Sequence, residues 1–169
     1  MIYGVDTKMR GVAISCPEFG IADSILLKPG RPRNVELAEL ARWFAERVPG
    51  DATVWIEDPI LGGSGNVQTA VKLSMTVGAI MAVSRPGAMH QVASATWKAA
   101  VVGHGHASKD DVRRWVETRL PAHAEACAAI EDRFDATGIA RYGELVAAGR
   151  VAGPGKVPRR RARRVLRAA

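Results

Sequence analysis

The sequence predicts an α/β fold in which a mixed five-stranded sheet carries helices on both faces. Apolar β runs near the N-terminus are followed by helical and β patterns that alternate along the chain. The composition is 47% hydrophobic, which is typical of a globular protein. At 169 residues, the chain is long enough for one domain with a substantial core.

Three β runs open the chain. Residues 2–6 and 11–15 are apolar and are separated by a short polar stretch, so we expect them to form a hairpin. Residues 22–27 add a third strand and complete an antiparallel meander. The Pro and Gly residues at 29–32 then end the strand.

A helix follows this break, and we expect Asn34 to be its N-cap. Its apolar residues recur at helical spacing and are Leu37, Leu40, Ala41, Phe44 and Val48. Its charged residues are expected to face outward and are Glu36, Glu39 and Arg47.

Residues 53–56 have the apolar pattern of a buried β-strand, and this strand ends at Glu57. The order β-β-β-α-β is the opening of a ribonuclease-H-like fold. In that layout the first and fourth strands are neighbours, so Asp6 and Glu57 are expected to lie close together.

The predicted helix at 66–83 is apolar nearly all round, which indicates burial on more than one side. Its second side could pack inside the domain or against a partner subunit. Residues 88–92 form the fifth strand, and Ser94 is expected to cap a short helix that ends at Val101. Ser108 and Asp111 have the spacing of a capping box for a helix that runs to Leu120.

Four acidic residues are candidates for a divalent metal site. Asp6 and Glu57 end two β runs, and Asp132 and Asp135 are three residues apart in the last helical segment, which places them on one helix face. Carboxylates from three separate elements are typical of a site for hard divalent cations. For Asp6 alone, the alternative is a strand-end residue that accepts turn hydrogen bonds.

These residues resemble those of the RuvC-type Holliday junction resolvases over positions 1–147. The most specific stretch is WKAAVVGHGHASK at 97–109, followed by an Asp-x-x-Asp-Ala pattern at 132–136. The resemblance implies a ribonuclease-H-like endonuclease that uses two Mg²⁺ ions per site, with Mn²⁺ as a substitute. It implies a homodimer that cuts a four-way DNA junction and leaves a 5′-phosphate and a 3′-hydroxyl. The implied metal-binding and catalytic carboxylates are Asp6, Glu57, Asp132 and Asp135, and the implied catalytic lysines near the DNA backbone are Lys98 and Lys109.

Other DNA contacts are expected in two loops. The family often carries an aromatic residue that inserts at the junction centre, and Ile60 and Leu61 occupy that region here, which implies an aliphatic wedge or none. His104 and His106 lie in the glycine-rich loop at 103–107. They could bind a metal ion, but loop histidines more often contact solvent or anions, so we expect them to contact DNA.

The positive charge of the chain is concentrated at its C-terminal end. The formal net charge is +7, and residues 156–169 contain seven basic and no acidic residues, so residues 1–155 are formally neutral. We therefore predict a nuclease domain at 1–152 and a basic tail at 153–169 that contacts DNA or serves only solubility. The candidate tail contacts are Arg159, Arg160, Arg161, Arg163 and Arg164.

Cys16 and Cys127 are far apart and lack zinc-ligand spacing, and no apolar run reaches the length of a transmembrane helix. We therefore expect a cytoplasmic protein, in the nucleoid or in a host cell, with no membrane contact.

Three other functions share this core. They are a nuclease that debranches flaps, forks and three-way junctions, a DNA-binding protein that has lost cutting, and an ATPase or kinase of the actin-like superfamily. The intact carboxylate set disfavours the second, and the short chain disfavours the third.

Overall fold

The computed structural model describes residues 1–59, 67–83, 87–128 and 130–153. A five-stranded sheet with the order β3-β2-β1-β4-β5 lies at its centre. Strands β1, β2 and β3 are antiparallel neighbours, whereas β4 runs parallel to β1 and β5 runs parallel to β4. The predicted meander and the pairing of the first and fourth strands are therefore confirmed. The strand bounds are Ile2–Lys8, Gly11–Cys16, Ile21–Leu26, Thr53–Glu57 and Ala88–Val92 for β1 to β5, with a 3₁₀ turn at Pro17–Phe19.

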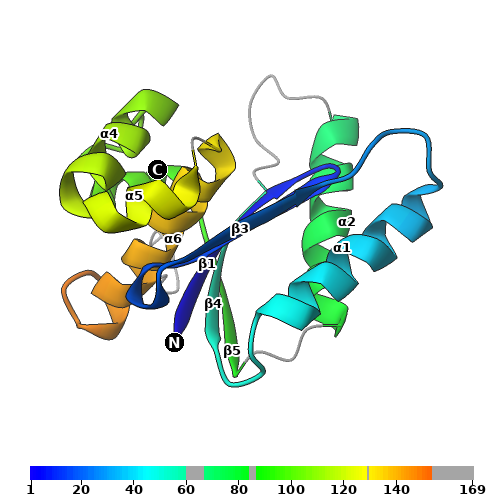
Figure 1. Ribbon diagram of the computed structural model, residues 1–169, viewed down its shortest axis with the longest axis horizontal. Helices are drawn as coiled ribbons and strands as arrows, with labels where there is room; N and C mark the ends of the chain where they lie inside the picture. The colour runs from blue at the N-terminus through cyan, green and yellow to red at the C-terminus, as the bar shows by residue number, and fades with distance from the viewer. Residues whose placement is uncertain (60–66, 84–86, 129, 154–169) are drawn as a thin grey trace, which may run out of the picture.

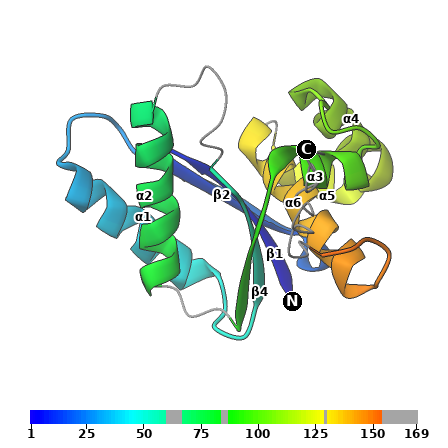
Figure 2. The same cartoon turned by 180° about the vertical axis from the view of Figure 1, so that it is seen from behind.

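Helices cover both faces of this sheet (Figures 1 and 2). Helices α1 and α2 pack together on one face, and α3, α4 and α5 gather around α6 on the other. The helix bounds are Arg33–Arg47, Val67–Val83, Ser94–Val101, Lys109–Arg119, Pro121–Cys127 and Glu131–Ala147 for α1 to α6.

Alternation along the strands divides the buried side chains between two cores. In β1, Tyr3 and Val5 belong to the core under α1 and α2. Gly4 lies on the opposite face, against α6. Asp6 follows at the next position of that face, so strand geometry directs its side chain towards α6.

Gly4 allows α6 to lie directly on β1. A Cβ atom at this position would lie 2.0 Å from the carbonyl oxygen of Ala136 and 2.3 Å from the backbone nitrogen of Ala140. Both contacts are with helix backbone, which cannot move aside by changing a rotamer. The absence of a side chain at Gly4 thus sets how closely the acidic end of α6 approaches Asp6.

The structure corrects two helix starts. Helix α1 begins at Arg33 after Pro32, so Asn34 lies within the helix and is not its cap. Helix α3 begins at Ser94 itself, and its N-cap, Ala93, offers no side-chain hydrogen bond.

The predicted capping box is confirmed. Ser108 accepts a hydrogen bond from the Asp111 backbone nitrogen, and Asp111 accepts one from the Ser108 backbone.

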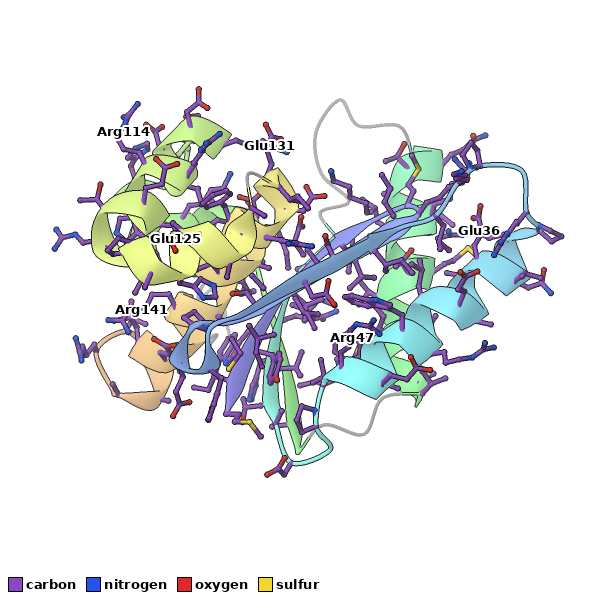
Figure 3. All side chains as sticks on the ribbon, viewed as in Figure 1. Glu36, Arg47, Arg114, Glu125, Glu131 and Arg141 are labelled. Carbon is purple, nitrogen blue, oxygen red and sulfur yellow. The ribbon has the colours of Figure 1, made fainter. Side chains whose placement is uncertain are left out.

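Glu36 was predicted to face outward, and this is wrong. Its side chain, labelled in Figure 3, is buried. It accepts hydrogen bonds from Arg10 of the β1–β2 turn at 2.8 Å and from Arg33 of α1 at 3.2 Å. These hydrogen bonds hold the pKa of Glu36 below its usual range. Arg33 also bonds to the carbonyl oxygen of Lys72 and to Thr76, and so joins α1 to α2.

A buried polar cluster joins α5 and α6 to the sheet. The Ser15 hydroxyl lies 2.9 Å from His123 Nε2 and 2.9 Å from the Thr137 hydroxyl. Burial lowers the pKa of His123, which favours the neutral ring. Strand β2 and helices α5 and α6 are therefore held together by hydrogen bonds as well as by apolar packing.

Helix α2 is less buried within the chain than its composition predicts. Its buried residues are Thr76, Val77 and Ile80, whereas Val71 and Met75 are 49% and 43% exposed. The expectation of burial on both sides is therefore not met inside this domain, and an apolar face remains on the surface.

Both cysteines are free and buried. None of the helices in the described part of the chain is both long and apolar enough to span a membrane.

Candidate functional site

Two of the candidate carboxylates come from the central parallel strand pair. Val5 pairs with Ile56 in the register of β1 and β4, and Asp6 and Glu57 are the next residues of the two strands. Neighbouring strands lie about 5 Å apart, and the two residues share the sheet face that α6 covers. The prediction that Asp6 and Glu57 meet is confirmed.

The other two carboxylates lie at the start of α6. Asp132 is in its first turn and Asp135 is one turn further along. Because Gly4 brings α6 onto β1, both residues lie close enough to Asp6 for their charges to affect it. All four side chains are partly buried.

The proximity of these acids changes their proton affinities. Burial and the charges of Asp135, Glu57 and Asp132 raise the pKa of Asp6 well above its usual range. Burial also raises the pKa of Asp135 to about 6, although Lys98 and Lys109 oppose the shift. Repulsion between the charged forms and the loss of water both drive these changes. Burial is the larger cause at both residues, so the protein around Asp6 and Asp135 disfavours their charged forms when no cation is bound.

Trp97 orients one of these acids, and the sequence reasoning missed this role. Its indole Nε1 donates a hydrogen bond to Glu57 Oε2 at 2.8 Å. The ring is fully buried and packs against Gly138, where an added Cβ would lie 2.5 Å from the indole. A buried aromatic ring held by α6 thus fixes the Glu57 carboxylate by a directed hydrogen bond.

Replacing Trp97 by Phe should lower the affinity for divalent metal ions and the rate of DNA cleavage by about tenfold or more. The reason is that a hydrogen bond to a metal ligand, such as the one from Trp97 to Glu57, holds that ligand in the orientation that binds the ion. The Trp43→Phe variant is the matched control, since Trp43 packs in the core on the opposite face of the sheet. Mn²⁺ titration of both variants measures the effect on metal binding, and thermal melting measures the effect on the stability of the core. Equal metal affinity in the two variants would show that the hydrogen bond to Glu57 is unimportant.

Lys8 contacts the acidic cluster directly. Its ammonium nitrogen lies 2.6 Å from Asp132 Oδ2, and the other oxygen of Asp132 is buried with no hydrogen-bond partner among the described residues. In the same part of the chain, no group of three or more Asp, Glu, His or Cys side chains is placed so that it could hold a metal ion as it stands. The four acids are neighbours, and one of them is bound to a lysine.

The two lysines singled out by the resemblance lie beside this cluster. Lys98 and Lys109 both act electrostatically on Asp135. Lys98 also lies over the Trp97 ring at 5.5 Å from its centroid. Lys109 forms a 2.7 Å ion pair with Glu131 at the start of α6, and the hydrogen bond in this pair raises the pKa of Lys109.

The histidine loop follows α3 in the chain. His104 and His106 are exposed. His104 lines a surface cavity of about 310 Å³ together with Asp111, Arg114 and Arg119, and none of the four candidate acids lines this cavity. The candidate wedge residues Ile60 and Leu61, and the arginines of the tail, lie outside the described residues.

The chemistry of the residues at this site, rather than their present side-chain arrangement, fits divalent cations. Hard ions such as Mg²⁺ prefer carboxylate oxygens, and the site contains four carboxylates together with a buried oxygen of Asp132 that has no hydrogen-bond partner among the described residues. Protons compete with metal ions for such oxygens. With a pKa of about 6 at Asp135, metal affinity should therefore fall as the pH drops below that value.

No model of a known protein family matches the sequence, and no curated protein sequence matches it. Solved structures do match. The structure of Thermus thermophilus RuvC has a TM-score of 0.69 and 18% identity, over 88% of this chain and 95% of that one. This chain has the RuvC fold.

A second solved structure is T. thermophilus RuvC in complex with a Holliday junction substrate. It matches with a TM-score of 0.63 and 18% identity, over 88% of this chain and 96% of that one. These matches to RuvC confirm the predicted ribonuclease-H-like fold, with its mixed sheet and its helices on both faces.

Proposed function

We propose that this chain is a Mg²⁺-dependent endonuclease that resolves four-way DNA junctions by paired hydrolysis of phosphodiesters. The observation that supports this most strongly is the convergence of four acids, from β1, β4 and α6, at one place in a RuvC fold. The raised pKa values of Asp6 and Asp135 reflect first the burial of their carboxyl groups and then the acids beside them, and bound divalent cations would stabilise the charged forms.

In this proposal Asp6, Glu57, Asp132 and Asp135 hold the metal ions. Bound Mg²⁺ would supply positive charge that neutralises the phosphodiester and stabilises the charge that develops during hydrolysis. Trp97 keeps Glu57 oriented by its hydrogen bond. Carboxylates alone would repel a phosphate, so the chain's own acids need these cations to act on DNA.

Lys98 and Lys109 are proposed to contact the phosphates next to the scissile bond. Both already act on Asp135, so their charges lie within reach of the reacting centre. Lys109 would exchange its ion pair with exposed Glu131 for a DNA phosphate. An exposed ion pair of this kind contributes little free energy, so breaking it to bind a phosphate costs little.

Cleavage of matched substrates tests the proposed function. Four-way, three-way, flap and duplex DNAs of the same arm sequences should be incubated with full-length protein and Mg²⁺. Preferential cutting of the four-way junction is expected. Equal cutting of all branched substrates would indicate a general debranching nuclease, and tight binding without cutting would indicate a junction-binding protein.

We further propose that two copies of the chain pair through α2. A four-way junction has twofold symmetry, so a C2 dimer presents two sites to opposed strands. The apolar residues that α2 leaves exposed suit such an interface and are Val67, Val71, Met75, Met81 and Val83.

A Val71→Glu variant should sediment as a folded monomer, because it places a charge in the proposed apolar interface without disturbing the buried residues of α2. Its junction cuts should become unpaired. The matched control is Val35→Glu, which changes an exposed valine of α1. A wild-type protein that sediments as a monomer at micromolar concentrations would contradict the pairing.

The basic tail is proposed to add contacts with the DNA backbone. Contacts between arginines and phosphates carry no branch information, so the tail should strengthen binding to duplex and junction alike. In this division, residues 1–152 select the substrate and residues 153–169 raise the overall affinity.

A further inference from the structure

The ammonium group of Lys8 lies in the acidic cluster as a direct consequence of strand geometry. Lys8 is two residues after Asp6 in β1, so the two side chains point to the same face of the sheet. Lys8 also pairs with Gly11 across the β1–β2 hairpin, which holds its backbone in place. Its Nζ then reaches Asp132 Oδ2 at 2.6 Å.

This ion pair involves one of the acids that the proposed function assigns to the metal. The side chain of Asp132 is 19% exposed and that of Lys8 is 47% exposed. The carboxylate is thus largely enclosed, whereas the lysine has room to swing into solvent. Within the described residues, Asp132 is the one member of the four acids that forms an ion pair.

The second oxygen of Asp132 is buried, and the part of the chain that the structure describes offers it no hydrogen-bond partner. A buried carboxylate oxygen is costly to leave without a hydrogen bond or a cation, so Lys8 satisfies only half of this carboxylate. A divalent ion could bind both oxygens of Asp132 or replace Lys8 at one of them. The Lys8 ammonium carries a single charge on a flexible side chain, so a divalent ion would displace it more easily than the reverse.

We propose that Lys8 is a built-in competitor for the metal ion held by Asp132. In the metal-free protein its ammonium neutralises part of the acidic cluster and keeps the start of α6 against β1. When a divalent ion binds, Lys8 leaves Asp132 and turns towards solvent, where it is free to contact DNA. This proposal rests on the proposed metal site. It adds that Lys8 lowers the affinity of the site for one of the two metal ions.

Titration of full-length protein with Mn²⁺ in the absence of DNA tests this directly. The Lys8→Met variant should bind the weaker ion about tenfold more tightly than wild type, since one competing charge beside a ligand is removed. The Lys8→Arg variant keeps the charge and should bind that ion as weakly as wild type. Thermal melting gives a second readout: Lys8→Met should melt lower than wild type without metal and gain more from saturating Mn²⁺.

Equal or weaker Mn²⁺ affinity in Lys8→Met, with two ions still bound, would overturn the role of Lys8 and leave the proposed metal site standing. Binding of one Mn²⁺ ion by wild type and of two by Lys8→Met would give the strongest support for competition between Lys8 and the metal ion. No binding of Mn²⁺ by either protein would overturn both this inference and the proposed function.

Discussion

An Asp6→Asn variant is expected to cut a four-way junction at least about a thousandfold more slowly than wild type, which corresponds to about 4 kcal/mol of lost transition-state stabilisation. Asp6 lies between Glu57 on β4 and the two acids of α6, and all three of them act on its charge. An amide at this central position cannot balance the metal ions that the proposed site holds. Binding of the junction should change little, because Asp6 is not a phosphate contact.

The measurement is a single-turnover cleavage rate at saturating protein and Mg²⁺. Glu57→Gln and Asp135→Asn should behave like Asp6→Asn, and Asp132→Asn should retain more activity because water can replace one member of a carboxylate pair. Asp51→Asn is the matched control, since Asp51 is an exposed acid at the opposite end of β4. Metal-dependent cleavage that persists in Asp6→Asn would refute the site.

A Gly4→Ala variant is expected to lose about 3 kcal/mol or more of folding free energy. The added methyl group would meet the backbone of α6 at 2.0 Å, so the helix has to move away from β1. This movement also carries Asp132 and Asp135 away from Asp6. The protein that still folds should therefore bind Mn²⁺ more weakly than wild type.

Urea unfolding and Mn²⁺ titration of the same samples check both effects. Gly78→Ala is the control, because no atom of the described residues lies within 4 Å of the corresponding Cβ position on α2. Since Ala has the higher helix propensity, that change should be neutral or stabilise by up to about 1 kcal/mol. A Gly4→Ala protein as stable as wild type would contradict the close packing of α6 on β1.

The sequence was sufficient to predict the strands and the pair of acids at their ends. Apolar β runs and their order led to the five-stranded sheet, and the same order made β1 and β4 neighbours. The sequence alone therefore predicts that Asp6 and Glu57 lie close together. The spacing of Asp132 and Asp135 likewise placed both residues on one helix.

Contacts that depend on tertiary packing could not be predicted in the same way. Glu36 has the pattern of a surface residue, but two arginines from the β1–β2 turn and from its own helix bury it. Trp97 was found in a sequence motif, but its hydrogen bond to Glu57 depends on how α3 and α6 pack.

Lys8 is a different case, because its position in the sequence already indicates which face of the sheet its side chain occupies. In a strand, residues two apart share a face, so a lysine two residues after Asp6 had to lie on the side of the acids. Its contact with Asp132, in contrast, depends on the position of α6 and could not be read from β1 alone. The same strand thus supplies an acid and a cation to the site.

The most direct test of the proposed chemistry is to map the products of one reaction. A four-way junction labelled in turn on each strand should be incubated with wild-type protein, with and without Mg²⁺. The proposed function predicts cuts at symmetry-related positions in two opposed strands, ends with a 5′-phosphate and a 3′-hydroxyl, and no cuts without the metal. A junction that stays intact in both Mg²⁺ and Mn²⁺, or cuts that do not require a metal ion, would contradict it.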